Sequence, residues 1–236
     1  MPPEEKRPFV QDLFTRIAPR YDLFNRLASC GMDAGWRREA MKQGAIQPGM
    51  RVLDLCTGTG DLALLAAKQA GRAGLVVGAD MTAAMLVYAE QKGRRRGQNA
   101  SWLCGDALCL PFADGQFDCI TIGFSTRNFA DLNAGLREIV RVLKRGGRLV
   151  ILETGRPSNP IVRMGYHFFL NTGARLIGWA LTGEAWPFTY LARSVEQFVT
   201  PEVFTERLRS LGTDVRFRPL SGGLVSLFVA TKQEMA

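Results

Sequence analysis

Short apolar strands alternate with helices between residues 51 and 153, and this pattern limits the fold more than any other feature of the sequence. The predicted strands are 51–55, 75–79, 101–104, 117–122 and 148–153, and the predicted helices between them are 60–70, 82–92 and 133–143. Parallel strands need crossover connections and both faces covered, so this order predicts an α/β protein with a doubly wound, mostly parallel sheet. Strands near 215–217 and 225–231 bring the predicted sheet to seven strands.

The flanking segments are predicted to complete the same domain. Residues 1–45 have helical periodicity and form an N-terminal helical cap, and residues 46–154 form the cofactor-binding core. An aromatic-rich insertion after the fifth strand, residues 155–200, is predicted to be a helical substrate lid, and residues 201–236 supply the closing helix and strands. The chain has 236 residues, of which 47% are hydrophobic, enough for one substantial core. We therefore predict a single domain over residues 1–236.

The composition disfavours several classes of protein. No run of about 18 apolar residues is present, so we expect no membrane span. The N-terminal sequence MPPEEKRPFV has no apolar signal core, which favours a cytoplasmic protein and leaves open a peripheral contact at the inner face of the membrane. The single histidine, His167, and five cysteines without a CxxC pair predict no metal site. We expect the cysteines to be reduced and mostly buried.

The formal net charge of +8 is concentrated at residues 92–96 and 137–148. Arg137, Arg141 and Lys144 recur at helical spacing, which predicts one solvated helix face. Neither cluster has interleaved aromatic side chains, so we expect no nucleic-acid partner. Contact with an anionic membrane surface stays open.

The sequence VLDLCTGTGDLA, residues 52–63, places Gly58 and Gly60 between a strand and a helix. Glycine permits a tight turn and the close approach of a ligand, and a helix N-terminus presents free N–H groups. Asp80 ends the next strand, where a carboxylate can accept both hydroxyls of a ribose. The pattern predicts an adenosine-containing cofactor at the carboxyl edge of the sheet. The alternative is a tight turn that binds no ligand.

Two carboxylates favour S-adenosylmethionine over a dinucleotide, although the glycine loop also fits the dinucleotide pattern. Asp54, four residues before Gly58, can hold the methionine amino group directly or through water and backbone, and it would repel a pyrophosphate. Asp106 ends the third strand, where it can take the adenine amino group. This ordered set resembles the motifs of class I S-adenosylmethionine-dependent methyltransferases over about residues 45–155.

Further segments resemble the menaquinone/ubiquinone biosynthesis C-methyltransferases over nearly the whole chain. They are FTRIAPRYDLFNRLASCG (14–31), DALCLPFADGQFDCITIGFSTRNFAD (106–131), LREIVRVLKRGGRLVILE (136–153), YLARSVEQF (190–198) and LSGGLVSL (220–227). The resemblance implies methyl transfer from S-adenosylmethionine, leaving S-adenosylhomocysteine. The acceptor would be a ring carbon of a reduced, polyprenylated benzoquinone or naphthoquinone precursor. A homodimer is left open.

The resemblance also implies which residues contact the cofactor. Besides Asp54, these are Gly58, Thr59, Gly60, Asp80, Met81, Asp106 and Ala107. The family has a further contact, often a serine, just after the fourth strand; Gly123 stands there, so only a backbone contact is expected.

Arg127 is predicted to be the main catalytic residue, assisted by Tyr21 and Asn128. The acceptor carbon becomes nucleophilic when a ring hydroxyl ionises, and a fixed guanidinium stabilises that charge. A water held by Arg127, or by Tyr21 and Asn128, is expected to take the proton. The alternatives are a salt bridge from Arg127 to a carboxylate such as Asp131, and a packing role for Tyr21.

Three stretches on the substrate side depart from the family pattern. Asp33-Ala34 stands in place of His-Arg, Thr154-Gly155 in place of Phe-Ser, and Phe124-Ser125-Thr126 in place of Phe, Gly and an aliphatic residue. They leave open two alternatives: a methyltransferase for another hydrophobic small molecule, and a non-catalytic adenosyl-binding subunit of a biosynthetic complex.

The insertion carries eight aromatic residues together with Arg163, Arg175 and Arg193. Part of this apolar surface must cover the sheet. The surplus predicts a hydrophobic lid over a lipid-like substrate, with an outer face that rests on anionic head groups.

Overall fold

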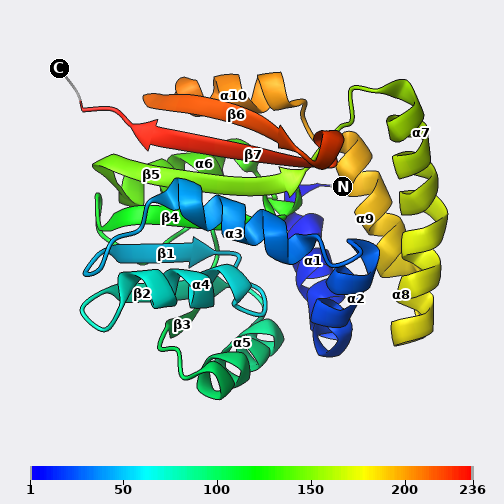
Figure 1. The fold of residues 1–236 in the computed structure, drawn as a ribbon, viewed down its shortest axis with the longest axis horizontal. Helices are drawn as coiled ribbons and strands as arrows, with labels where there is room; N and C mark the ends of the chain where they lie inside the picture. The colour runs from blue at the N-terminus through cyan, green and yellow to red at the C-terminus, as the bar shows by residue number, and fades with distance from the viewer. Residues whose placement is uncertain (1, 235–236) are drawn as a thin grey trace.

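Seven strands form one sheet in the computed structural model, which describes residues 2–234 (Figure 1). The strands are β1 (Arg51–Leu55), β2 (Leu75–Asp80), β3 (Ser101–Cys104), β4 (Phe117–Gly123), β5 (Leu143–Thr154), β6 (Thr213–Leu220) and β7 (Val225–Lys232). Their order across the sheet is β3-β2-β1-β4-β5-β7-β6, and β7 alone runs antiparallel to its neighbours. The predicted mostly parallel, seven-stranded sheet is therefore confirmed.

Helices cover both faces of this sheet. They are α1 (Pro3–Ile17), α2 (Tyr21–Ala28), α3 (Asp33–Gly44), α4 (Asp61–Ala70), α5 (Ala83–Arg96), α6 (Leu132–Val142), α7 (Pro160–Phe168), α8 (Ala174–Thr182), α9 (Trp186–Gln197) and α10 (Pro201–Arg209). In Figure 1, α3 and α4 lie in front of the sheet, and α6 and α10 lie behind it. The fold is therefore doubly wound, as the alternation of elements predicted.

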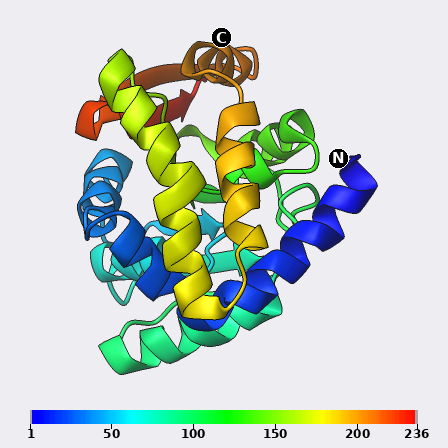
Figure 2. The same ribbon diagram turned by 90° about the vertical axis from the view of Figure 1, so that its right-hand side faces the viewer.

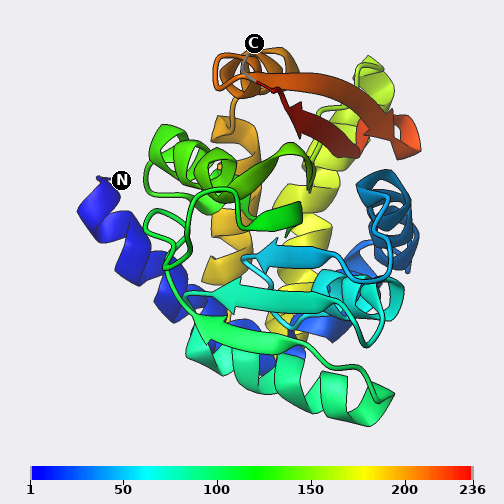
Figure 3. The ribbon, with the colours of Figure 1, turned by 90° about the vertical axis from the view of Figure 1, so that its left-hand side faces the viewer.

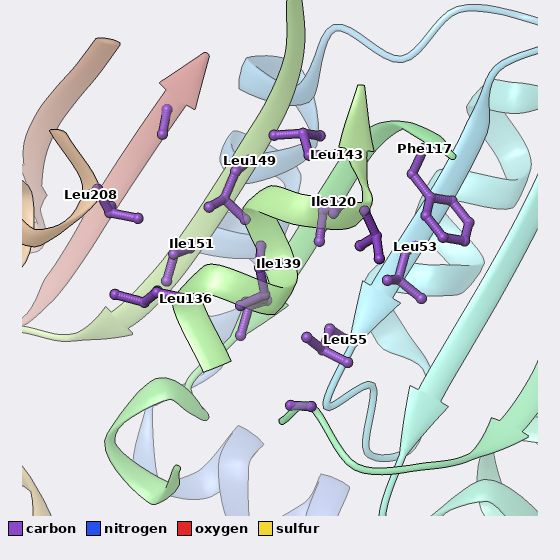
Figure 4. Packing of buried hydrophobic residues seen from close by; sticks show 14 of the residues in the cluster. Leu53, Leu55, Phe117, Ile120, Leu136, Ile139, Leu143, Leu149, Ile151 and Leu208 are labelled. Carbon is purple, nitrogen blue, oxygen red and sulfur yellow. The ribbon is translucent and has the colours of Figure 1, made fainter. Parts of the chain in front are cut away.

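The core consists of two apolar layers, one on each face of the sheet. Figure 4 shows the layer under α6 and α10, where Leu53, Ile120 and Ile151 of the strands pack near Leu136 and Leu208 of the helices. Each is almost fully buried, which stabilises the fold by about 1.5–3 kcal/mol per large side chain. The opposite layer joins the strands to α3 and α4. Strands buried on both faces explain the continuous apolar runs in the sequence.

The N-terminal helices and the insertion meet over one edge of the sheet. The arrows of β1, β4 and β5 in Figure 1 point toward the side on which α1, α2 and α7–α9 lie. Figure 2 views that side: α7 and α8 follow one another through the π-helical stretch Phe169–Gly173, and α9 runs beside them. Phe24 of α2 and Phe188 of α9 pack with ring centroids 4.4 Å apart. Figure 3, from the opposite side, shows the strands of the sheet in front of these helices. Functional groups at the strand ends are thus covered by chain segments far away in sequence.

Several local predictions were wrong. Residues 21–36 contain α2 and the start of α3, separated from α1 by the 3₁₀ turn Ala18–Arg20. The fifth strand begins at Leu143 rather than Arg148, with an irregular register where it pairs with β4. All five cysteines are free, but Cys30, Cys104 and Cys109 are exposed, contrary to the expectation of mostly buried thiols.

The basic clusters are largely paired with carboxylates. Lys92 Nζ lies 2.6 Å from Asp22 Oδ2 and 2.9 Å from Asp61 Oδ1, so it joins α5 to α2 and α4. Arg141 pairs with Glu138 and Asp114, and Lys144 lies in β5 rather than on α6, where it pairs with Asp118. The single solvated helix face expected from Arg137, Arg141 and Lys144 is therefore wrong. Within residues 2–234, no helix combines the length and the apolar character needed to cross a bilayer.

Candidate active site

The loop after β1 is held in a tight turn against the end of β2. Cys56, Gly58 and Gly60 adopt positive φ angles of 53°, 54° and 82°. The amide of Gly58 donates to Asp80 Oδ2 at 2.8 Å, and the amide of Thr82 donates to Asp80 Oδ1 at 2.8 Å. Burial raises the pKa of Asp80 above its usual range, while these two amides oppose the shift. The hydrogen bonds fix a carboxylate at the strand end, where the sequence predicted a ribose contact.

Glycine is required at the two positions of this loop for different structural reasons. A Cβ at Gly58 would have only Tyr21 within 4 Å, at 3.8 Å, so its backbone faces an open cradle. A Cβ at Gly60 would lie 2.7 Å from the ring of Trp102 and 3.0 Å from Ala89. Gly60 is therefore required by packing between the loop and α5. Gly58 alone has the open approach that a ligand needs.

Asp54 lies behind the loop rather than in a cavity. Its carboxylate accepts hydrogen bonds from Thr57 Oγ1 and Thr121 Oγ1, each at 2.6 Å, and from the Ala63 amide at 3.0 Å. The side chain is fully buried, and burial raises its pKa to about 6. The direct contact with a methionine amino group stays a prediction, and these three hydrogen bonds already occupy both carboxylate oxygens. Asp54 instead holds the loop and the start of α4, and any effect on a ligand passes through the backbone.

The raised pKa of Asp54 predicts a pH-dependent stability. The folded state binds a proton at Asp54 more tightly than the unfolded chain does, so stability falls as pH rises from about 4 through 6. We expect the wild-type protein to lose about 2 kcal/mol of unfolding free energy relative to Asp54→Asn between about pH 4 and pH 7, because the pKa of Asp54 rises from 3.8 to about 6. Urea unfolding of both proteins across this range measures the difference. A difference that stays constant with pH would contradict the prediction.

Thr59 also points away from the predicted ligand. Its hydroxyl donates to Asp22 Oδ1 at 2.5 Å and accepts from Lys92 Nζ at 3.0 Å. The side chain is buried in this network, which ties α2 and α5 to the glycine loop. A cofactor contact by Thr59 stays a prediction, and because its side chain is held in this network the contact would come from its backbone.

A cavity of about 70 Å³ lies at the carboxyl ends of β1–β3. Five of the predicted cofactor residues line it: Gly58, Asp80, Met81, Asp106 and Ala107. Helix α1 forms the opposite wall through Arg7, Val10 and Phe14, and Arg7 Nε lies 3.1 Å from Asp106 Oδ2. Half-buried carboxylates at the end of β2 and just after β3, with an open glycine backbone between them, fit the ribose, adenine and amino-acid parts of an adenosyl cofactor.

A second, larger cavity of about 200 Å³ lies beneath the insertion. Its walls come from α1, α2, α3 and α7–α9 and from the turn after β4, and most of the lining is apolar. Phe14, Tyr21 and Asn128 line both cavities. The two cavities therefore adjoin at these side chains, which is the arrangement that transfer from one ligand to another needs.

Arg127 lines the larger cavity and is paired with Glu153, not with Asp131. Arg127 Nη1 lies 2.7 Å from Glu153 Oε1, with side-chain exposures of 7% and 1%, and it also donates to the carbonyl of Phe124. Nε of Arg127 is buried without a hydrogen-bond partner among residues 2–234. Asp131 instead caps α6 by accepting from the Ala134 amide at 3.0 Å. Arg127 thus places a buried cation in the wall of an apolar cavity, while its Nε is enclosed by protein.

The other two predicted catalytic residues lie at the junction of the cavities. Asn128 Oδ1 accepts a hydrogen bond from the Tyr190 hydroxyl at 3.2 Å. Tyr21 packs edge-on against Phe14, with centroids 5.9 Å apart, and burial raises the pKa of its phenol. A raised phenol pKa keeps Tyr21 protonated, so Tyr21 can donate a hydrogen bond but cannot readily accept a proton.

The structure accounts for two of the unusual positions in the sequence. Gly123, at the end of β4, lines neither cavity, but its carbonyl accepts from Ser125 Oγ at 3.1 Å, and Ser125 does line the cofactor cavity. At Gly155 a Cβ would lie 2.1 Å from the carbonyl oxygen of Gly223, so no side chain fits there.

His167 is half exposed, lies 3.2 Å from Glu196, and lines neither cavity.

The sequence did not identify the contributions of α1 and α3. Arg7 and Phe14 of α1 line the cofactor cavity, and Asp33 and Arg37 of α3 line the larger one. Asp33-Ala34 was noted only as a departure from the family pattern, and nothing in the local pattern placed α3 beside β4.

The chain matches known proteins over almost its whole length. The ubiE/COQ5 methyltransferase family matches residues 2–232. Demethylmenaquinone methyltransferase of Thermus thermophilus is 42% identical over 93% of this chain and 100% of its own. The ubiquinone/menaquinone biosynthesis C-methyltransferase UbiE of Geobacter sp. is 40% identical over 97% of this chain and 98% of its own.

Solved structures show the same fold at lower sequence identity. A SAM-dependent methyltransferase from Aquifex aeolicus has a TM-score of 0.64 at 19% identity, covering 89% of this chain and 97% of its own. A putative S-adenosyl-L-methionine-dependent methyltransferase from Methanococcus maripaludis has a TM-score of 0.65 at 20% identity and covers 94% of each chain. The matches confirm the enzyme class inferred from the sequence, an S-adenosylmethionine-dependent methyltransferase. Because the family match extends from α1 to β7, this chain belongs to the ubiE/COQ5 methyltransferase family.

Proposed function

We propose that this protein transfers the methyl group of S-adenosylmethionine to a ring carbon of a reduced, prenylated quinone precursor. The observation that carries the proposal is the pair of adjoining cavities, one lined by strand-end carboxylates and the other apolar with a buried arginine. The relatives named above for methylation in menaquinone and ubiquinone biosynthesis support the same acceptor class.

The cofactor-side residues would bind and orient the donor. Asp80 would accept the ribose hydroxyls, Asp106 the adenine amino group, and the Gly58 backbone would border the amino-acid part. S-adenosylmethionine supplies a methyl group already activated by a sulfonium. The protein's own contribution is therefore mainly positioning.

Arg127 would stabilise the charge on the acceptor ring. Arg127 lines the acceptor cavity, and Glu153 holds its guanidinium in place. In a cavity that excludes water, a fixed cation favours the ionised hydroxyl that makes the neighbouring ring carbon nucleophilic. Arg127 stays protonated, so the proton would leave to a water near Asn128.

The lining of the acceptor cavity suits a prenylated ring. Aromatic and aliphatic side chains from six helices surround it, including Phe24, Phe169, Leu170, Phe188 and Leu191. Burying a prenyl tail against these side chains would contribute about 25 cal/mol per Å² of apolar surface. A polar acceptor would gain little from such walls.

Transfer of labelled methyl from S-adenosylmethionine to reduced demethylmenaquinone tests this function, with the matching demethylated benzoquinol in parallel. We expect label in one of the quinols. Binding of the cofactor without label in either acceptor would overturn the acceptor class and leave the fold unaffected.

We also propose that the outer face of α7 and α8 rests on an anionic membrane. Phe168 and Trp179 are 70% and 59% exposed, and the same helices expose Ile161, Met164 and Leu176. Arg163 and Arg175 lie exposed among them. Figure 2 shows these helices on the outside of the molecule, over the edge of the sheet that carries the site. An apolar helix face with interspersed arginines is typical of interfacial binding to anionic lipid.

The double variant Phe168→Ser/Trp179→Ser is expected to bind anionic phosphatidylglycerol vesicles at least about 10-fold more weakly, because two large apolar side chains no longer enter the interface. Vesicle sedimentation measures the partition coefficient. Val203→Ser, which removes an exposed apolar side chain on α10, is the matched control and should bind as wild type does. Equal binding by all three proteins would contradict the membrane assignment.

A further inference from the structure

A second buried ion pair lines the acceptor cavity. It comes from α3, which is far in the sequence from Arg127. Asp33 and Arg37, one turn apart at the start of α3, form a salt bridge through Arg37 Nη1 and Asp33 Oδ2, with side-chain exposures of 17% and 11%. Both residues line the cavity. Most acid–arginine pairs at this spacing lie in solvent, as Glu90–Arg94 on α5 does. This pair is enclosed and faces an apolar space.

Phe124 connects this pair to Arg127. The Phe124 carbonyl accepts a hydrogen bond from Arg127 Nη1, and its ring centroid lies 5.9 Å from Arg37 Cζ. Phe124 holds a left-handed backbone with φ of 58°, which is strained for a residue with a side chain. One strained residue thus contacts both guanidinium groups. The two ion pairs, Arg37–Asp33 and Arg127–Glu153, therefore belong to one polar assembly in an otherwise apolar cavity.

The Asp33–Arg37 pair has unused hydrogen-bonding capacity. Asp33 accepts from Arg37 and, at 3.2 Å, from Ser29 Oγ, whereas a carboxylate offers about four acceptor sites. The hydrogen bonds of Arg37 to residues 2–234 involve Nη1 alone, with Nε 3.7 Å from Asp61. The pair can therefore accept a hydrogen bond from a hydroxyl and donate one to the same oxygen.

Glu153 does not offer the same chemistry. It is fully buried, does not line the cavity, and accepts from Thr126 Oγ1 at 2.7 Å and from the Thr154 amide at 2.8 Å in addition to Arg127. Arg127 can therefore present only donors to a ligand. Of the two pairs, Asp33–Arg37 alone presents an accessible carboxylate.

We propose that Asp33 and Arg37 bind the distal hydroxyl of a para-dihydroxy ring, while Arg127 faces the oxygen next to the methylated carbon. Resting on the proposed function, this makes Asp33 a specificity-determining residue. A dihydroxy ring donates to Asp33 and accepts from Arg37 at the same oxygen. The oxidised quinone has no hydroxyl to donate and places a carbonyl oxygen against the carboxylate. The pair thus favours the reduced ring over the quinone. It also favours a ring with two para oxygens over a ring with one.

Equilibrium binding of two matched pairs of non-prenylated, already methylated rings tests the assignment. The probes are 2-methyl-1,4-dihydroxynaphthalene and 2-methyl-1-naphthol, which differ only in the distal hydroxyl; 2-methylhydroquinone and 2-methylphenol are the benzene pair. Each is titrated calorimetrically without oxygen in the presence of S-adenosylhomocysteine. We expect wild type to bind the dihydroxy member of at least one pair about 10-fold or more tightly, since a hydrogen bond to a charged group is lost with the hydroxyl.

In Asp33→Ala the preference should disappear, and affinity for the monohydroxy ring should stay within about 2-fold of wild type. Asp33→Asn keeps the shape of the side chain and should reduce the preference. It replaces Asp33→Ala in the test if Asp33→Ala melts at a lower temperature than wild type. Glu90→Ala breaks the solvent-exposed pair of α5 and should change nothing.

The outcomes separate this inference from the proposed function. Wild type that binds both members of each pair equally, or Asp33→Ala that weakens both equally, overturns the assignment while the acceptor class stands. Wild type that binds S-adenosylhomocysteine but none of the four rings also overturns the assignment, whereas the proposed function is overturned only by absence of label in both prenylated quinols.

Discussion

Replacing Arg127 by methionine is expected to lower kcat for methyl transfer about 10²–10³-fold, the usual loss when one fixed donor to a developing oxyanion is removed. The KM for S-adenosylmethionine should not change, because Arg127 lines the acceptor cavity and does not line the cofactor cavity. Steady-state kinetics with a reduced quinol acceptor measure both constants.

A loss of folding stability in Arg127→Met must be distinguished from a loss of catalytic rate. Breaking a buried ion pair by removing one partner costs about 3–5 kcal/mol, because the other charge is left unpaired. Glu153 would be that charge, although Thr126 and the Thr154 amide continue to donate to it. The double variant Arg127→Met/Glu153→Gln removes both charges and should regain stability without regaining activity. If kcat recovers together with stability, Arg127 has only a structural role.

Asp80→Ala is expected to weaken S-adenosylhomocysteine binding about 10²–10⁴-fold. Two hydrogen bonds from ribose hydroxyls to a carboxylate are lost, each worth about 1.5–3 kcal/mol. The variant also frees the amides of Gly58 and Thr82, which loosens the glycine loop in the same direction. Isothermal titration of the cofactor product measures the loss.

A matched control is available at the opposite end of the sheet. Asp114 is a highly exposed carboxylate that pairs with Arg141, and Asp114→Ala should bind the cofactor product as wild type does. An Asp80→Ala protein that keeps wild-type affinity would remove the ribose assignment and with it the main support for the cofactor side of the site.

The strand-end residues could be predicted because their positions follow from local patterns. Asp80 ends β2 and Asp106 lies two residues after β3, and the ends of parallel strands share one edge of the sheet. The glycine loop was recognised by composition and spacing. These features need only the order of elements along the chain, which periodicity supplies.

The roles of side chains next to those positions could not be predicted in the same way. Asp54, Thr59 and Gly60 stand in the motif, yet the structure gives them hydrogen bonds and packing contacts behind the loop. Spacing shows that a residue is near the ligand loop but not which way its side chain points. That direction depends on partners such as Asp22 and Trp102, which come from other elements.

The sequence by itself determined the fold, the family and the edge of the sheet where the site lies, because hydrophobic periodicity and the order of motifs are properties of neighbouring residues. The tertiary structure alone decided that Glu153 pairs with Arg127 and that α1 closes the cofactor cavity. It also placed the Asp33–Arg37 pair across from the catalytic turn. These contacts join residues up to about a hundred positions apart, and only packing of the helices over the sheet edge brings them together.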